Sequence, residues 1–123
     1  MICLTEMSGR IKIELACISM GKDLCVVISG GELPHLGAMA VAQVRASLAD
    51  PAKLSSSTSV ITIVGHKEDA LAKEVADNLA VQLNKNVVSC CGIHIDDATS
   101  DEIHIVADMV KKMIQVLITQ LKE

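Results

Sequence analysis

Three of the four histidines in this chain occur in the same kind of sequence context. His35 lies in GGELPHLG, His66 in IVGHKED and His94 in CGIHIDD, so each follows a glycine at the end of an apolar run. Neutral imidazole is the commonest side-chain metal ligand, and three imidazoles leave coordination positions for water or a bound molecule. Brought together, the three histidines could hold a metal ion. Taken singly, each could cap a loop or bond a carbonyl group.

Acidic residues and glycines accompany these histidines. Asp96 or Asp97 could be a fourth metal ligand, or could accept a hydrogen bond that fixes the tautomer of His94. Glycine lets the backbone or a ligand come close. This property makes candidate binding positions of Gly30, Gly31, Gly37, Gly65 and Gly92.

A phosphate-bearing ligand is a second possibility at the same loops. The backbone amides of residues 66–69 begin a predicted helix, where an anion is stabilised. Lys67, Arg45 and the serines at 55–57 are potential phosphate partners, whereas Glu68 and Asp69 weaken the case. The loops match neither the Rossmann nor the P-loop fingerprint, and HExxH and GxSxG motifs are absent. Nucleophilic catalysis is therefore disfavoured.

The composition excludes several classes of protein. The 123 residues suit one ordinary domain, and half of them are hydrophobic, which argues against disorder. A net charge of -4 and the absence of Phe, Tyr and Trp argue against nucleic-acid binding. No apolar run reaches the roughly 20 residues that cross a bilayer, and the first residues do not resemble a secretory signal. We expect a cytoplasmic protein without membrane contact.

The five cysteines contain no CxxC pair and are expected to be small buried residues. Cys90 and Cys91 are adjacent, so on a strand they point to opposite faces and do not form a mutual disulfide.

Hydrophobic periodicity predicts five strands and two helices in the order ββββαβα. This order predicts an α+β fold, in which two helices cover a mixed β-sheet. We expect one domain over 1–123, with its core at about 9–118 and a short N-terminal tail at 1–8. A polar connection is expected from Asp50 to Ser57. The expected strands are 10–20, 24–29, 38–48, 58–65 and 87–95, and the helices are 68–83 and one from Thr99 almost to the C-terminus.

The direction of these strands predicts where the histidines meet. If strands 24–29, 38–48 and 58–65 alternate in direction, the first and third end at the same edge of the sheet. Strand 58–65, its helix and strand 87–95 form a βαβ unit, so these two strands are parallel. All three glycine–histidine loops then leave one edge, a common place for ligands. The prediction fails if residues 38–48 are a helix.

The last helix has two apolar faces. One is a stripe of seven residues, and a second set lies roughly opposite at Ile105, Met109 and Val116. The second face has little to cover it in a chain of this length, so we expect a homo-oligomer. The stripe comprises Ile103, Val106, Val110, Met113, Ile114, Leu117 and Leu121, with His104 at its edge.

The segments GGELPHLGAMAVA, VGHKEDALAKEVADNLA and CGIHIDDAT occur in this order, and with them the chain resembles the prenylated-flavin chaperone family over about residues 9–118. That family includes the small D subunit that accompanies gallate and other hydroxyarylic acid decarboxylases. The chain is also distantly similar, in fold, to small proteasome-assembly chaperones. This second likeness implies a sheet packed against two helices and frequent dimerisation.

The resemblance implies a non-catalytic chaperone that binds prenylated FMN, or FMN, and delivers it to a prenyl-FMN-dependent decarboxylase. His35, His66 and His94 match the family's motif histidines and would hold a divalent metal, such as Fe(II), beside the flavin. The surrounding cofactor-binding residues would be Gly30, Gly31, Gly37, Gly65, Lys67, Gly92 and Asp96. The alternatives are a small three-histidine metalloenzyme and an assembly or structural subunit of a decarboxylase complex.

Overall fold

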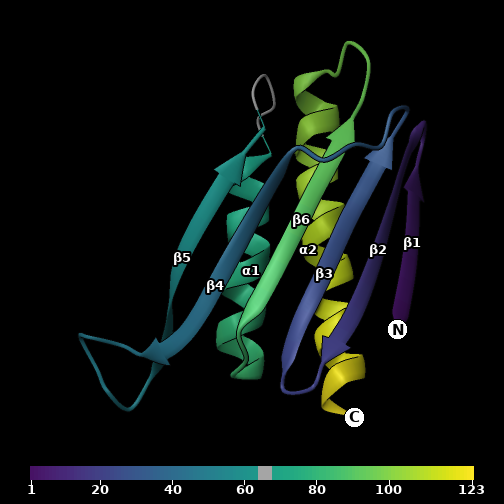
Figure 1. Ribbon diagram of the computed structural model, residues 1–123. Coiled ribbons are helices and arrows are strands. Elements are labelled where there is room, and N and C mark those ends of the chain that lie inside the picture. Colours follow the sequence, from purple (N-terminus) through teal and green to yellow (C-terminus); the bar gives the residue numbers. More distant parts are fainter. Residues whose placement is uncertain (64–67) are drawn as a thin grey trace.

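The computed structural model describes residues 1–63 and 68–123, which form one six-stranded sheet and two helices (Figure 1). In chain order the elements are β1 Ile2–Ser8, β2 Ile11–Met20, β3 Asp23–Gly31, β4 Ala38–Ala46, β5 Leu54–Thr62, α1 Asp69–Leu83, β6 Val87–His94 and α2 Ser100–Lys122. Neither helix is long and apolar enough to cross a membrane.

The strands follow the spatial order β1-β2-β3-β6-β4-β5, so the last strand in sequence lies in the middle of the sheet. Only β3 and β6 are parallel neighbours, and every other adjacent pair is antiparallel. Because β4 is antiparallel to both β5 and β6, strands β3, β5 and β6 run in one direction and end at one edge. We call this the carboxyl edge. The predicted mixed sheet with two helices is confirmed, and residues 38–46 are indeed a strand.

Two predicted details need correction. The expected tail at 1–8 is edge strand β1, whose half-buried Ile2 and Leu4 pack against the core. Strand β5 begins at Leu54 inside the expected polar connection, because hydroxyl groups of its inward side are bonded to Asp77 of α1. Strands β5 and β6 run in the same direction, as predicted, and β4 lies between them.

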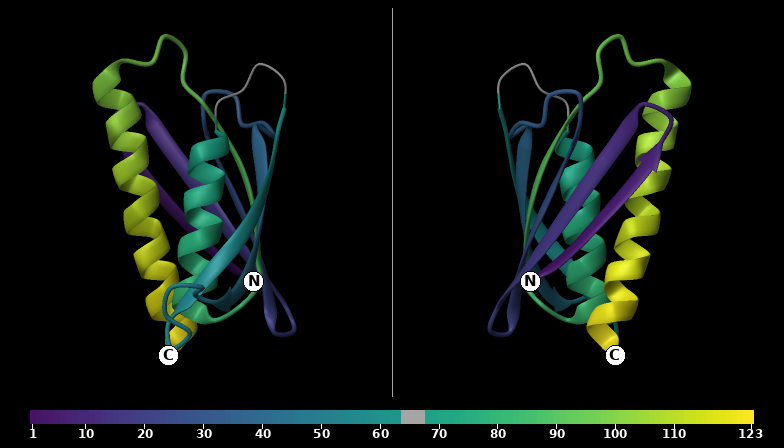
Figure 2. Two further views of the ribbon diagram at one scale, coloured as in Figure 1. Left: turned by 90° about the vertical axis from the view of Figure 1, so that its left-hand side faces the viewer. Right: turned by 90° about the vertical axis from the view of Figure 1, so that its right-hand side faces the viewer.

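Both helices cover the same face of the sheet (Figure 2). Helix α1 packs on β4, β5 and β6, and α2 packs on β1 and β2. The fully buried positions of β4 are all alanines, Ala38, Ala40 and Ala42, and α1 also buries alanines, which allows the helix to approach the sheet closely. The core is closed by larger side chains, among them Ile13, Val26, Leu79 and Leu117.

Helix α2 begins with the predicted capping box. Thr99 Oγ1 accepts a hydrogen bond from the Glu102 amide at 3.1 Å, and the Glu102 carboxylate accepts one from the Thr99 amide at 3.2 Å. The predicted stripe is buried from Val110 to Leu117, but Ile103 is 60% exposed because the first turn of α2 extends beyond the core. Of the second apolar set, Ile105 and Val116 are exposed, whereas Met109 is partly buried against the core.

Candidate functional site

The carboxyl edge brings His35 and His94 together. Their ring centroids are 6.2 Å apart, with the ring planes at 70°. Backbone hydrogen bonds hold the 32–37 loop over the end of β6, from the Glu32 amide to the His94 carbonyl at 2.8 Å and from the Gly37 amide to the Cys91 carbonyl at 2.9 Å. Residues 59 positions apart in sequence thus become neighbours through strand pairing.

The half-buried His35 ring is bonded on both sides. Its Nε2 lies 2.9 Å from Glu68 Oε1, and its Nδ1 lies 3.0 Å from the Leu33 carbonyl oxygen. Glu68 precedes the first turn of α1, so this contact joins the helix to the 32–37 loop. An imidazolium ring would donate from both nitrogens here, and a metal ion bound by His35 would replace one of these contacts. The sequence predicted Glu68 in the first turn of the helix but did not predict its contact with His35.

His94 is held by the next carboxylate along the chain. Its Nε2 lies 2.8 Å from Asp96 Oδ1, so Asp96 can orient the ring as the sequence predicted. A hydrogen bond shared between the Glu32 and Asp96 carboxyl groups raises the pKa of Glu32 and lowers the pKa of Asp96, and the contact with His94 lowers the latter further. Asp97 stands beside them in a left-handed conformation, with φ of 48°.

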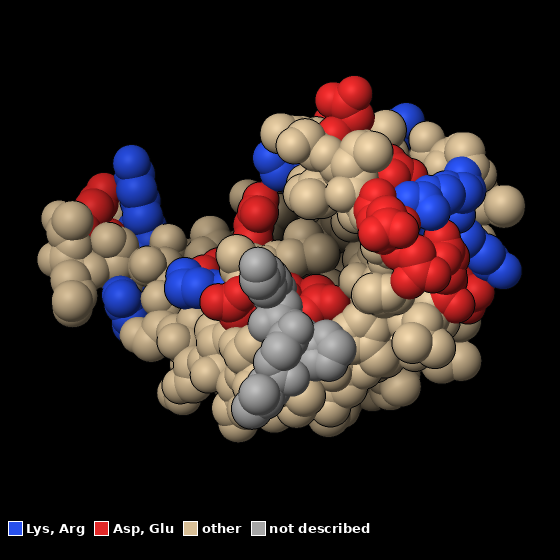
Figure 3. Space-filling view, turned by 90° about the horizontal axis from the view of Figure 1, so that it is seen from above, with Lys and Arg blue, Asp and Glu red and all other residues tan. Residues whose placement is uncertain are grey.

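Arg10 ties this acidic group to α2, a link that the sequence did not predict. Its guanidinium donates to Glu102 at 2.7 and 2.8 Å, to Glu32 at 2.8 Å and to the Asp96 carbonyl at 2.7 Å. The hydrogen bond from Arg10 lowers the pKa of Glu102 to about 2. Figure 3 looks down on this edge and shows acidic side chains gathered there, with basic ones among them.

The predicted glycines of the described part, Gly30, Gly31, Gly37 and Gly92, are surrounded by the chain itself. A Cβ on Gly92 would overlap the His35 carbonyl group, and one on Gly37 would overlap the Glu68 carboxylate. Gly31 has φ of 75°, and a Cβ there would overlap the His94 carbonyl, while Gly30 lies against Lys12. Their observed role is close packing of loops around the two histidines. Contact of these glycines with a ligand stays a prediction.

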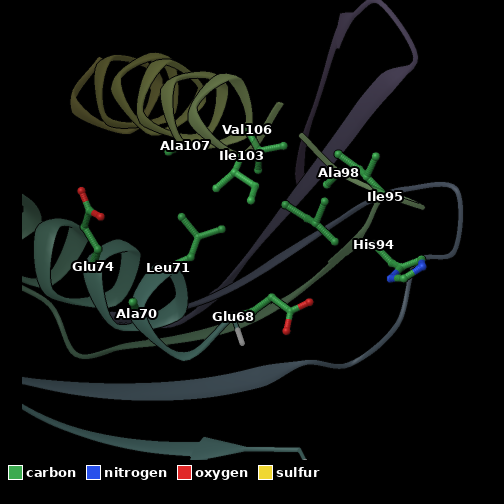
Figure 4. Close-up of a pocket in the computed structure, with 11 residues that line it drawn as sticks. Glu68, Ala70, Leu71, Glu74, His94, Ile95, Ala98, Ile103, Val106 and Ala107 are labelled. Carbon is green, nitrogen blue, oxygen red and sulfur yellow. The ribbon is translucent and has the colours of Figure 1, made fainter. Parts of the chain in front are cut away.

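A pocket of about 450 Å³ lies between the N-terminal turns of the two helices, and His94 is among the residues that line it. Figure 4 shows Leu71 of α1 and Ile103 and Val106 of α2 directed into this space, with Ile95 closing its end. Glu68 and His94 form its rim on the side of the sheet, and Glu74 lies farther along α1. The size falls in the range of roughly 300–1,000 Å³ that is usual for small-molecule sites.

The remaining predicted residues divide into three groups. Gly65, His66 and Lys67 lie outside the described residues. Arg45 and the serines at 55–57 lie at the opposite edge, where Arg45 Nε donates to Ser57 Oγ at 2.7 Å, so their predicted part in phosphate binding at the loops is wrong. The reason is that β4 leaves the carboxyl edge and β5 returns to it. His104 is on the surface of α2.

The metal prediction is not tested by this arrangement. Among residues 1–63 and 68–123, no three His, Cys, Asp or Glu side chains are grouped so that they could hold a metal ion. Two of the three predicted ligands are close together, and the third is outside the described part. Thiolate chemistry at the adjacent cysteines is disfavoured, because burial raises the pKa of Cys90 and raises that of Cys91 to about 12.

Comparisons with known proteins agree with this architecture. A chain in the crystal structure of a chaperone complex for yeast 20S proteasome assembly has a similar fold, with a TM-score of 0.59, 12% sequence identity, and coverage of 98% of this chain and 99% of that chain. At this identity the likeness concerns the fold alone. No curated protein sequence matches the chain.

The decisive comparison is with protein families. The family described as the prenylated flavin chaperone LpdD-like domain matches residues 7–122, which is almost the whole chain. The match extends from the end of β1 to the end of α2, and so includes both histidine loops, the pocket and the Arg10 contacts. This chain therefore belongs to the prenylated flavin chaperone LpdD-like family.

Proposed function

We propose that this chaperone binds prenylated FMN at the carboxyl edge, with an apolar part of the flavin in the pocket between α1 and α2. The observation that carries the proposal is an apolar pocket lined in part by His94, whose ring centroid lies 6.2 Å from that of His35. Family membership makes the protein a non-catalytic handler of prenylated flavin. The pocket offers a specific place for that cargo.

The lining of the pocket suits a transient ligand. It consists mainly of aliphatic side chains, and the chain has no Phe, Tyr or Trp on which a flavin could stack. Apolar contact alone contributes about 25 cal/mol per Å² of buried surface, without the further gain from aromatic stacking. We infer an affinity sufficient for transport that still permits release.

The acidic residues of the carboxyl edge affect how the phosphate group of the cofactor could bind. Glu32, Glu68 and Asp96 lie around the histidines, and the guanidinium of Arg10 is already engaged by acidic partners. A bare phosphate would be repelled here. A divalent ion such as Fe(II), held by His35, His94 and His66, would supply positive charge beside the cofactor.

The protein would hand the cofactor to a prenyl-FMN-dependent decarboxylase. Large apolar side chains are exposed around the carboxyl edge, with Leu33 64%, Leu36 53% and Ile63 40% exposed. Exposed apolar groups beside a binding site favour contact with a partner protein during transfer. We also propose that the protein is cytoplasmic and a homo-oligomer.

Anaerobic equilibrium titration with prenylated FMN, with and without Fe(II), tests this proposal. We expect saturable binding that weakens about 10-fold in His94→Ala, because a charge-assisted contact is lost. His104→Ala, the same change on the exposed surface of α2, should bind like the wild type. Absence of binding in both conditions would exclude the function, and normal binding by His94→Ala would exclude this site.

Delivery requires a separate experiment. Loaded chaperone is mixed with cofactor-free decarboxylase, and recovery of decarboxylase activity is followed over time. We expect faster recovery than with the same amount of free prenylated FMN. Equal rates would show that the chain binds the cofactor but does not deliver it.

A further inference from the structure

The first turns of α2 are exposed or only partly buried. The fully buried residues of this helix begin at Val110, and Ile103 near its start is 60% exposed. This part of α2 nevertheless forms one wall of the pocket through Ile103 and Val106, whereas Leu71 belongs to the opposite wall on α1 (Figure 4). The width of the pocket therefore depends on what holds the beginning of α2 in place.

Arg10 holds this end of α2. Its Nε donates to Glu102 Oε2 at 2.7 Å and its Nη2 donates to Glu102 Oε1 at 2.8 Å, a bidentate contact that fixes both position and direction. Among the described residues, Arg10 is the partner from another element that hydrogen-bonds a side chain in these turns, because Glu102 otherwise bonds the Thr99 cap of its own helix. The start of α2 is thus tied to the sheet by one guanidinium group.

The same guanidinium also holds two loops at the carboxyl edge. Its Nη2 donates to the Asp96 carbonyl oxygen at 2.7 Å, which fixes the backbone between Ile95 and Ala98, two residues of the pocket lining. Its Nη1 donates to Glu32 Oε1 at 2.8 Å, directly after the end of β3. Every nitrogen of the guanidinium donates, and the turn and loops that it joins all lie at this edge (Figure 1).

The turn that carries Arg10 is itself well fixed. Gly9 and Arg10 form the two-residue turn between β1 and β2, in which Ser8 pairs with Ile11. Gly9 has φ of 57°, a left-handed conformation that glycine adopts without steric cost. Ile11 is 1% exposed, so the chain enters the core directly after Arg10. A side chain on such a turn can hold neighbouring segments at fixed distances.

We propose that Arg10 is a positioning residue for cofactor binding, which sets the distance between the two walls of the pocket by holding α2 and both loops to the β1–β2 turn. This inference rests on the proposed function, because it concerns binding in the same pocket. Arg10 acts through the segments that it joins and not by touching the cofactor, since its donors are already engaged by Glu32, Glu102 and the Asp96 carbonyl.

This role requires the shape of arginine and not only its charge. The Arg10 side chain is 44% exposed, so each of its ion pairs taken singly adds little to stability. The planar guanidinium, however, presents its donors in fixed directions and so orients several partners at once. Lysine would supply the same charge from a single nitrogen, which cannot reproduce the contacts with all three segments.

Anaerobic titration with prenylated FMN measures the effect of Arg10 on binding. We expect Arg10→Gln to weaken binding about 10-fold in protein that remains folded, because the pocket loses its fixed width. Arg10→Lys should recover only part of this loss. The matched control is Arg45→Gln at the opposite edge, where Arg45 donates to Ser57, and it should bind like the wild type. Circular dichroism and urea denaturation verify that each variant is folded under the conditions of the titration.

A double-mutant cycle separates positioning from direct contact with the cofactor. If Arg10 acts through α2, Glu102→Gln alone should weaken binding about 3-fold, and the double variant should bind within about 2-fold of Arg10→Gln. Direct contact between Arg10 and the phosphate group predicts the opposite, because Glu102→Gln would release the guanidinium. Unchanged or tighter binding by Glu102→Gln would therefore overturn the proposal.

Hydrogen–deuterium exchange of the free protein tests the contact with α2 without cofactor. We expect the amides of residues 103–107 to exchange at least about 5-fold faster in Arg10→Gln than in the wild type, with those of residues 110–118 unchanged. Unchanged exchange at residues 103–107, normal binding by folded Arg10→Gln, or full recovery by Arg10→Lys would each overturn the proposal. Absence of binding by the wild type would instead contradict the proposed function, and exchange would still decide whether Arg10 holds α2.

Discussion

His94 depends on a carboxylate two residues away. Because Asp96 Oδ1 lies 2.8 Å from His94 Nε2, it fixes the direction of a ring that is otherwise exposed. Asp96→Asn should weaken prenylated FMN binding by about 10-fold in the presence of Fe(II), as loss of an orienting partner does at metal sites. The titration described above measures this.

Asp97→Asn is the matched control for that change. Asp97 has a left-handed backbone, with φ of 48°, which Asn tolerates well, and it has no place in the contact with His94. Cofactor binding should therefore be unchanged. Equal weakening by both substitutions would mean that the negative charge of the loop matters rather than the orientation of the ring.

Gly92 is needed for the packing of the two histidine loops. In Gly92→Ala the new methyl group would overlap the His35 carbonyl, so we expect a loss of about 1–3 kcal/mol in the free energy of unfolding and weaker cofactor binding. Gly21→Ala meets only open space, although φ is 62°, and should cost about 1–2 kcal/mol without affecting binding. Urea denaturation measures the loss of stability in each variant, and titration with prenylated FMN measures binding, which should weaken only in Gly92→Ala.

At the residue scale, the sequence predicted the pairing of His35 with His94 because two glycines and strand direction place both at one edge. It could not predict Arg10, whose partner Glu102 is 92 residues away and shares no local pattern with it. It also misplaced Arg45, because a residue near a loop in sequence can still lie at the far edge of the sheet.

At the scale of elements, the N-terminus of α2 is held by an ion pair that depends on pH. The pKa of Glu102 falls from its ordinary 4.5 to about 2 beside Arg10, so its stabilisation is complete above pH 4.5 and is lost as the pH falls through about 2. Glu102→Gln keeps a capping side chain but removes this dependence. The urea concentration at half unfolding, measured between pH 5 and 2, should fall less steeply with pH in the variant than in the wild type. Equal slopes would show that the Arg10–Glu102 ion pair does not stabilise the fold in this pH range.

The link between β5 and α1 explains why a serine-rich segment is a strand. Ser56 Oγ and Thr58 Oγ1 donate hydrogen bonds to the Asp77 carboxylate, and the exposed Lys73 ammonium group donates another. Burial alone would disfavour the charged carboxylate, but these hydrogen bonds outweigh it and lower the pKa of Asp77. Periodicity of apolar residues could not reveal a strand that is attached through hydroxyl groups.

Removal of that carboxylate should loosen the edge of the sheet. We expect Asp77→Ala to cost about 1–3 kcal/mol, because two hydroxyl groups lose their acceptor. Lys73→Ala removes only the solvent-exposed ion pair and should cost less than about 1 kcal/mol. Thermal unfolding measures both, and equal costs would show that the hydroxyl contacts contribute little.

At the scale of the whole molecule, the two sides of the sheet have different properties. The helix side ends in a pocket at the carboxyl edge, where the two histidines lie, and the other side presents an apolar sheet face. The class of fold was predictable from alternation and helix periodicity. The central position of β6 was not, because the order of strands in a sheet depends on packing between distant segments.

Co-elution of prenylated FMN with the protein in anaerobic gel filtration tests the central claim most directly. The chain contains no Trp, Tyr or Phe, so the absorption of the bound cofactor is observed almost without a protein background. We predict that the flavin band elutes with the wild type and with Leu48→Asp, a change at a loop position that is 90% exposed. It should be lost from Leu71→Asp, which places a charge in the pocket. Elution of the flavin band with small molecules for the wild type, or with the protein for Leu71→Asp, would contradict the proposed site.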